Sequence, residues 1–300
     1  MLTKMFGDYL LPADPYSEND FSVRCLEYLE CDEDWRSKQI AFWNKYLKGI
    51  SPKDFYDVMT CGLPEGTQIR LEIDSYDQGR LRICVTYESW DTFHDIRIID
   101  FQGQKILSGR MLIDSKCRGR GWGRQLLANY IRIGRLCGLS YMYARPSLNN
   151  GGYTWAKAGF YLRKPFMQNT LKPIIKARLN ALERFIPEEH YERALQLSEL
   201  KQPESIADIA ALDFDIFEIP GMKSTLESNT YDEKLRSIFQ NIHPIEFALI
   251  RDAAQYCHDK NIPFTLGRCL LAGVEWRGFI DFNNEEQLRR IGQYTQCNFG

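Results

Sequence analysis

The sequence predicts a mixed α/β (α+β) protein, in which a mostly antiparallel sheet is flanked by helices. Four runs of alternating or β-branched residues predict the sheet, at residues 67–73, 80–87, 93–101 and 105–114. Turn-forming residues separate these runs, and separators this short favour antiparallel pairing because a parallel pair needs a long crossover connection. Apolar residues recur at helical spacing on both sides of this region, which predicts an N-terminal helical cap and a mainly helical C-terminal extension.

The chain has 300 residues, enough for one large domain or two smaller ones. We expect three regions: a helical region over residues 1–62, an α/β core over 63–166, and the mainly helical extension over 167–300. Within the core, a helix over residues 121–137 leads from the fourth strand to a fifth strand over 139–144. That order implies a crossover connection, and therefore one parallel pair inside the sheet.

Capping signals place the elements outside the four-strand run. An apolar face runs along residues 34–49, and Ser51 with Pro52 then marks the start of a second helix. After the fifth strand we expect a short helix at 151–159 and a last core strand at 159–163.

The extension predicts further helices and a mixed end. Helical spacing is found over four segments, residues 171–187, 188–200, 231–242 and 244–260. The stretch from residue 264 to 294 predicts two short strands followed by a helix. Asn283 and Glu286 stand at capping-box spacing before that helix.

Composition limits the classes of partner. The formal net charge of -2 gives no overall attraction to nucleic acid or to an anionic membrane, so any anion site must be local. Nine scattered cysteines without a CxxC pair predict reduced thiols, and the four histidines show no metal-ligand spacing, so we expect no metal. We found no signal-peptide pattern and no run of about 20 apolar residues, so we expect a cytoplasmic protein without a membrane span.

A turn rich in glycine and arginine precedes the core helix, in the stretch CRGRGWGRQLLANYIRIGRLCG. Its charged and flexible positions are Arg118, Gly119, Arg120, Gly121, Gly123 and Arg124. Glycines allow the backbone N–H groups of a helix N-terminus to converge on an anion, and arginines add charge-assisted bonds to phosphate. The spacing G-x-G-x-G is neither the dinucleotide-binding fingerprint nor a Walker loop. Two interpretations remain at this point: a tight strand-to-helix turn, or a loop that holds an anion.

These residues carry a resemblance to a known family. The sequence R-G-R-G-W-G, residues 118–123, is similar to the Arg/Gln-x-x-Gly-x-Gly/Ala signature of the GNAT superfamily of acyltransferases. The strand SGRMLID precedes it, and a helix and the strand LSYMYA follow it. The later stretch NNGGYTWAKAGF, residues 149–160, resembles the second family element, a short helix that ends in Gly-Phe before a strand. The resemblance covers about a hundred residues, so the core is expected to be GNAT-like.

The resemblance implies acyl transfer from acetyl-CoA, with the amides of the Gly/Arg turn around the pyrophosphate. The fourth strand would splay from the fifth near Met111–Ile113, which leaves amides for the thioester carbonyl as in an oxyanion hole. The residues expected to bind acetyl-CoA are Met111, Ile113, Arg118, Gly119, Arg120, Gly121, Trp122, Gly123, Arg124 and Asn150.

The sequence departs from the family pattern at the expected general acid. Many members carry a tyrosine four residues before the final glycine of the second element, and here that position is Trp155, which donates no proton. Tyr153 stands two residues earlier. For the general base, Glu88, Asp100 and Asp114 all fall at predicted strand ends, and Asp114 is nearest to the turn. We therefore expect Asp114 and Tyr153 to be the catalytic residues.

The acceptor stays open among a small amine, a protein and an RNA. The form of the second element is similar to versions in bacterial effector- and toxin-like proteins, which implies the cytosol of a target cell as an alternative compartment. The rival function is an inactive GNAT-shaped binding module that acts through its C-terminal lobe. Trp155 favours the binding module, and the intact Gly/Arg turn favours the enzyme. The near-neutral charge argues against an RG-type RNA binder.

Overall fold

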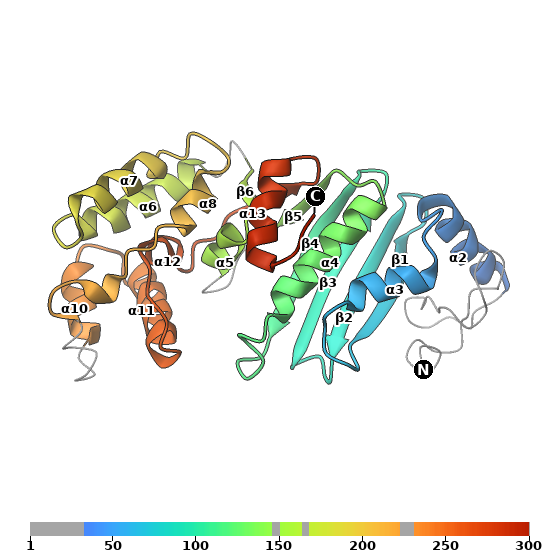
Figure 1. Ribbon diagram of the computed structural model, residues 1–300, viewed down its shortest axis with the longest axis horizontal. Coiled ribbons are helices and arrows are strands. Elements are labelled where there is room, and N and C mark those ends of the chain that lie inside the picture. The colour runs from blue at the N-terminus through green and yellow to red at the C-terminus, as the bar shows by residue number, and fades with distance from the viewer. Residues whose placement is uncertain (1–32, 146–150, 164–167, 223–230, 300) are drawn as a thin grey trace. The chain divides into compact units, whose positions relative to one another are not determined.

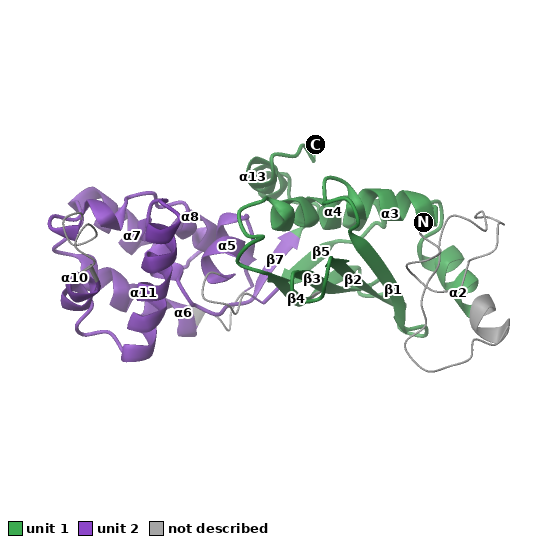
Figure 2. Ribbon diagram, turned by 90° about the horizontal axis from the view of Figure 1, so that it is seen from below, with its two compact units in different colours: residues 1–143, 281–300 green, residues 144–280 purple. Residues whose placement is uncertain are grey.

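A computed structural model describes residues 33–145, 151–163, 168–222 and 231–299. The chain forms two compact units, coloured separately in Figure 2. Unit 1 comprises Met1–Tyr143 with Asp281–Gly300, and unit 2 comprises Ala144–Ile280. The boundaries of these units differ from the boundaries of the three predicted regions. The three regions stay a prediction.

The predicted fold class, mixed α/β with a mostly antiparallel sheet flanked by helices, is confirmed (Figure 1). Unit 1 contains α2 (Glu33–Tyr46), α3 (Pro52–Thr60), β1 (Gln68–Ser75), β2 (Arg80–Tyr87), β3 (Phe93–Asp100), β4 (Lys105–Ile113), α4 (Trp122–Leu136), α13 (Glu285–Thr295), and β5 (Tyr141–Ala144), which ends at the unit boundary. Strands β1 to β4 form an antiparallel meander, and β5 runs parallel to β4. In unit 1, α3, α4 and α13 lie on the same face of this sheet (Figures 1 and 2).

Alternation along the strands builds the core under these helices. Six apolar side chains of β1 and β2 point to the helix-covered face and are buried: Ile69, Leu71, Ile73, Leu81, Ile83 and Val85. The residues that alternate with them along the strands face the other side of the sheet and are mostly charged. Glu72 there is 2% exposed and pairs with Arg70 at 2.8 Å and Arg82 at 3.6 Å. The period of two thus separates an apolar core face from an ionic face.

A β-bulge interrupts the pairing of β3 and β4. Ser108 pairs with Arg97, but the next partner of Asp95 is Met111, so two residues of β4 lie opposite one residue of β3. A Cβ atom on Gly109 would lie 1.9 Å from the carbonyl oxygen of Ile96. Only glycine, which has no Cβ, avoids this clash. The bulge turns the side chains of the last part of β4 back toward α4.

Two charged residues of β3 lie on the helix-covered face rather than in solvent. Asp95 and Arg97 are 0% and 1% exposed, and Arg97 Nη2 lies 3.0 Å from Asp95 Oδ1. The hydroxyl of Tyr130, on α4, donates to Asp95 Oδ2 at 2.7 Å. Burial, followed by the charge of Asp95, raises the pKa of Tyr130 well above its ordinary value. This triad joins α4 to the middle of the sheet.

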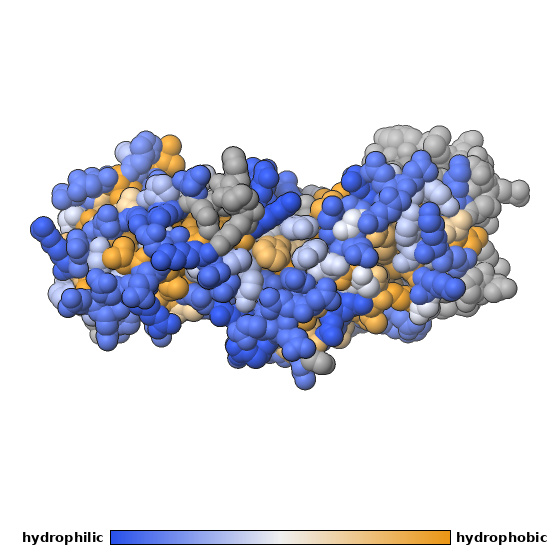
Figure 3. Space-filling model, turned by 90° about the horizontal axis from the view of Figure 1, so that it is seen from above, coloured by the Kyte–Doolittle hydropathy of each residue, from blue (hydrophilic) through white to orange (hydrophobic). Residues whose placement is uncertain are grey.

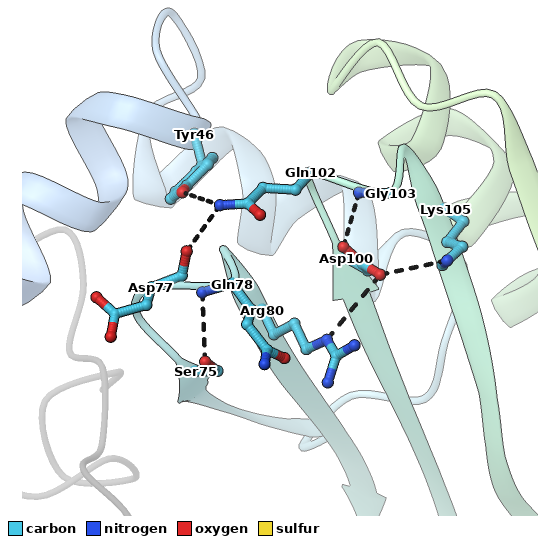
Figure 4. A network of polar contacts seen from close by, with 9 residues as sticks. All are labelled: Tyr46, Ser75, Asp77, Gln78, Arg80, Asp100, Gln102, Gly103 and Lys105. Carbon is cyan, nitrogen blue, oxygen red and sulfur yellow. Dashed lines mark hydrogen bonds and ion pairs between the residues drawn. The ribbon is translucent and has the colours of Figure 1, made fainter.

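The two hairpins at one end of the sheet are tied together by polar contacts (Figure 4). Gln102 Nε2 donates to the carbonyl oxygen of Asp77 at 2.7 Å, which joins the β3–β4 turn to the β1–β2 turn. Asp100 Oδ1 accepts from the amide of Gly103 at 2.8 Å, and its other oxygen lies 3.5 Å from Lys105 Nζ. The carboxylate of Asp100 therefore stabilises the β3–β4 turn.

Unit 2 is mainly helical. It contains α5 (Gly151–Lys157), β6 (Tyr161–Leu162), α6 (Gln168–Leu182), α7 (Glu188–Ser198), α8 (Ser205–Ala210), the 3₁₀ turn η1 (Ile216–Glu218), α10 (Tyr231–Ile238), α11 (Pro244–Asp259), α12 (Leu266–Leu271), and β7 (Gly278–Asp281), which ends at the unit boundary. Strands β6 and β7 pair antiparallel. The guanidinium of Arg178, 1% exposed, donates to three carbonyl oxygens at the end of α12, those of Cys269, Leu270 and Ala272. A buried helix end is thereby satisfied.

The end of the chain corrects two local predictions. The stretch from residue 264, predicted as a strand, forms helix α12, and Thr265 caps it by accepting from the amide of Arg268. Helix α13 begins one residue later than predicted, because Asn284 rather than Asn283 accepts from the amide of Gln287. At the other end of the chain, Ser51 caps α3 as predicted. A side-chain cap thus marks the start of α3, α12 and α13.

Across the described residues, we find no helix that is both long enough and apolar enough to cross a membrane. Hydrophilic side chains cover most of the surface shown in Figure 3, and apolar ones lie in separate small patches. Large apolar side chains that are exposed in the described part of the chain are Trp90, Leu136, Tyr141 and Ile245.

Candidate functional site

The Gly/Arg turn connects the end of β4 to the start of α4, in unit 1. Asp114 begins this connection, and its amide donates to the carbonyl oxygen of Thr92 at 2.9 Å. Its carboxylate Oδ1 accepts from the amide of Lys116 at 2.8 Å, and its carbonyl oxygen accepts from the amides of Cys117 and Arg118. Asp114 therefore shapes the turn through both its backbone and its side chain.

Two glycines of the turn have left-handed backbone conformations. Gly119 and Gly121 both have φ of 84°, a region that strains other residues. Gly121 is the N-cap of α4, and no side chain caps this helix. The first turn of α4 also contains no acidic residue. The helix start thus presents backbone N–H groups and a partial positive charge without a side-chain acceptor.

Three arginines surround this helix start. Arg118 Nε donates to the carbonyl oxygen of Ile113 at 2.9 Å, so its side chain folds back along the turn. The Arg120 guanidinium lies 5.3 Å from the ring centroid of Trp122. A Cβ on Gly121 would lie 3.5 Å from Arg124 Nη2, which places the Arg124 side chain beside the cap. Within the described ranges, none of these three arginines is within ion-pair distance of a carboxylate.

Trp122 anchors the start of α4 to the sheet. Its ring packs edge-on against Tyr87 and Phe93, with centroid distances of 5.1 and 6.0 Å. Directly after it, a Cβ on Gly123 would lie 3.4 Å from Ile113 and 3.7 Å from Met111. The side chains of Met111 and Ile113 therefore lie beneath the first turn of α4, as the bulge in β4 requires.

Strands β4 and β5 pair over a short distance only. Lys105 pairs with Tyr141 and Ile106 pairs with Met142, both near the beginning of β4. The β4–β5 register of the described residues ends at Ile106 of the nine-residue strand β4, so Met111–Ile113 lie beyond it. The edge of β4 that leads to the Gly/Arg turn therefore has backbone groups outside the β4–β5 ladder.

The second predicted element lies in unit 2, and Asn150 lies outside the described residues. Tyr153, on α5, is 3% exposed, and its hydroxyl accepts from Lys157 Nζ at 3.0 Å. The Arg268 guanidinium lies over the ring of Tyr153 at 4.6 Å. Trp155 packs edge-on against Phe160, with ring centroids 4.9 Å apart. Two cations thus surround the tyrosine predicted as the general acid.

The predicted base candidates divide between the two ends of the sheet. Asp114 and Glu88 both follow strand ends on the side of the Gly/Arg turn, because Tyr87 and Ile113 both pair with Phe93. Asp100 pairs with Lys105 at the opposite end. Asp114 belongs to unit 1 and Tyr153 to unit 2, and the catalytic roles of both residues stay predictions.

Sequence reasoning did not single out an imidazole at the same end of the sheet. His94, on β3, is 1% exposed, and its ring stacks on Trp90 with centroids 4.2 Å apart and an interplanar angle of 11°. A single histidine on a strand has no spacing that distinguishes it, so the signal is structural. The buried triad of Asp95, Arg97 and Tyr130 was missed for the same reason.

The chain matches no protein-family model, no curated protein and no solved structure. In the described part of the chain, no group of three or more His, Cys, Asp or Glu side chains is arranged to hold a metal ion.

Proposed function

We propose that this protein is a GNAT-type acyltransferase that transfers an acetyl group from acetyl-CoA to an amine or hydroxyl. The observation that carries this proposal is the start of α4, where an uncapped helix N-terminus follows two left-handed glycines. Three arginines without a described carboxylate partner lie around it. This arrangement suits a doubly charged group with several acceptor oxygens, and the pyrophosphate of acetyl-CoA is such a group.

The edge of β4 supports the proposal from a second direction. An acyl carbonyl needs hydrogen-bond donors where negative charge develops in the tetrahedral intermediate. The segment Met111–Ile113 follows the bulge and lies outside the β4–β5 ladder of the described residues. In the proposed complex, the backbone N–H groups of this segment are such donors. The segment ends at Ile113, directly before Asp114, where the Gly/Arg turn begins.

In the proposed reaction, the acceptor nitrogen or oxygen forms a bond to the acyl carbon, and the carbon–sulfur bond breaks. The acceptor loses a proton to a base, for which Asp114 is our candidate. CoA leaves as a thiolate, a step that needs no proton donor, and solvent then protonates it. We propose a cytoplasmic setting, in the protein's own cell or in a target cell, and an acceptor that is a small amine, a protein or an RNA.

A thermal-shift titration with acetyl-CoA tests the proposal. Wild type should gain about 2.7 kcal/mol of stability when acetyl-CoA is present at about 100 times its dissociation constant. The variant Gly121→Asp should lose this gain, because its carboxylate would lie at the phosphate position, beside Arg124. The matched control is Gly121→Asn, which places a neutral side chain of nearly the same shape at the same left-handed position.

The comparison separates charge from backbone strain. A gain that is retained by Gly121→Asn and lost by Gly121→Asp would support the pyrophosphate site. A well-folded wild type that shows no shift would contradict the proposal. Binding without any transfer to a panel of amines, proteins and RNA would favour the rival function, an inactive GNAT-shaped binding module.

A further inference from the structure

His94 is a buried imidazole with a fixed orientation. It lies near the beginning of β3, and its Nδ1 atom is 2.6 Å from the carbonyl oxygen of Trp90. A carbonyl oxygen only accepts hydrogen bonds, so Nδ1 carries the hydrogen and donates it. In the neutral ring, the opposite nitrogen, Nε2, therefore holds a lone pair.

The Nε2 atom of His94 has no hydrogen-bond partner among the described residues, although it is buried. Buried polar atoms are nearly always satisfied, so an exception in a rigidly held ring requires an explanation. An imidazole that donates through one nitrogen to a fixed acceptor and leaves the other as an oriented acceptor has the arrangement of a general base.

The position of His94 relates it to the proposed acyl site. On β4, its partner in the ladder is Leu112, the central residue of the Met111–Ile113 segment. The side chains flanking Leu112, those of Met111 and Ile113, lie beneath α4 on the helix-covered face. Since side chains alternate along a strand, His94 and Leu112 lie on the opposite face. An acceptor that approaches the segment from that face would meet His94.

The loop between β2 and β3 covers this imidazole. Trp90 stacks on the ring of His94 while 44% of its own side chain remains exposed. In the same loop, Glu88 has φ of 56°, a left-handed conformation that is uncommon for a residue other than glycine. Trp90 therefore covers one face of the buried ring, and its own side chain stays accessible to an incoming molecule.

We infer that His94 is the general base for the acceptor, an inference that rests on the proposed acyltransferase function. Nε2 takes the proton of the acceptor amine or hydroxyl while the acceptor forms its bond to the acyl carbon. The carbon–sulfur bond breaks, its electron pair leaves with the CoA sulfur, and the proton on His94 is returned to solvent or to that thiolate. Because Nε2 is buried, the acceptor reaches it only when the side chains that cover it move. This inference makes Asp114 a turn-forming residue rather than the base.

The test uses His94→Asn, because the asparagine amide keeps a donor for the Trp90 carbonyl and removes the Nε2 lone pair. The matched control is His190→Asn, a histidine of α7 in unit 2. Two quantities are measured for each protein: acetyl-CoA binding by thermal shift, and CoA release with water or hydroxylamine as the probe nucleophile. His94→Asn should bind acetyl-CoA as wild type does and release CoA about 100-fold more slowly, the lower range of general-base effects.

The outcomes separate this inference from the proposed function. Unchanged CoA release in His94→Asn would overturn the role of His94 and leave the acyltransferase intact. A wild type that binds acetyl-CoA but releases no CoA to either nucleophile would also overturn it. A wild type that binds no acetyl-CoA would overturn the proposed function first. The ¹⁵N spectrum of the wild-type ring needs no variant: it should show neutral His94 protonated at Nδ1, and protonation at Nε2 would refute the assignment.

Discussion

Replacing Tyr130 with phenylalanine should destabilise the protein by about 1.5–3 kcal/mol, the range for a hydrogen bond to a charged group. The Tyr130 hydroxyl lies 2.7 Å from Asp95 Oδ2, and both side chains are 0% exposed. Without it, the contact that remains to this oxygen among the described residues is that of Arg97 Nε at 3.2 Å. The vacated space is that of one oxygen atom, too small for a water molecule to replace the lost donor. The carboxylate therefore stays buried and less well satisfied.

The same hydroxyl predicts a dependence on pH. Because folding raises the pKa of Tyr130 well above 10, the unfolded chain loses this proton at a lower pH than the folded protein does. The stabilisation is complete below about pH 10 and is lost as pH rises beyond it, by up to about 1.4 kcal/mol per pH unit. The difference between wild type and Tyr130→Phe should therefore shrink from pH 9 to pH 11.

Urea denaturation followed by far-UV circular dichroism measures both effects. The control is Tyr76→Phe, which keeps the ring contact with Phe42 and removes no hydrogen bond seen in the described residues. It should change stability by less than about 0.5 kcal/mol. If Tyr130→Phe behaves like this control, or if its deficit stays constant from pH 9 to pH 11, the reasoning about the buried triad is wrong.

Three further outcomes follow from other parts of the chain. Gly109→Ala should unfold the sheet or shift its register, because the new Cβ would lie 1.9 Å from a backbone oxygen. Gly119→Ala should lower the melting temperature only modestly, because no atom lies within 4 Å of its Cβ. Burial raises the pKa of Cys269 to about 12, so iodoacetamide at pH 8 should label exposed Cys61 and spare Cys269, as mass spectrometry of the native protein would show. Two α6 lysines lower the pKa of Glu199 to about 2, so its stabilisation is lost as pH falls from about 4.5 toward 2, and melting curves of Glu199→Gln should lack this acid-limb component.

The local elements were predictable because their signals lie within the element. The run at residues 80–87 forms β2 with the same bounds, and the helix expected at 121–137 forms Trp122–Leu136. Alternation, turn residues and apolar spacing are patterns that extend over a few neighbouring residues. They can therefore be recognised in a single sequence without knowledge of tertiary contacts. The stretch from residue 264 was mistaken for a strand because its short apolar run has no clear period, and the Thr265 cap decides for a helix.

The candidate site could be predicted in part. The glycines of the Gly/Arg turn predicted a flexible turn before a helix start, and the structure adds that Gly119 and Gly121 both have a left-handed backbone with φ of 84°. The bulge at Gly109 had no such signal, because the close approach of the Ile96 carbonyl depends on the neighbouring strand. For the same reason, the sequence did not predict the direction in which the Met111 side chain points after the bulge.

The sequence by itself determined the class of fold, the order of the strands in the meander and the place of the glycine-rich turn, since each depends on neighbours along the chain. Only the tertiary structure decided which polar groups are buried. Asp95 and Arg97 alternate with apolar residues as solvent-facing charges would, yet they lie under α4 because Tyr130 and their own ion pair satisfy them there. His94 is buried too, but its Nε2 atom has no hydrogen-bond partner among the described residues. Burial and hydrogen-bond partners are set by residues that are distant in sequence, and they become defined when the sheet and helices pack.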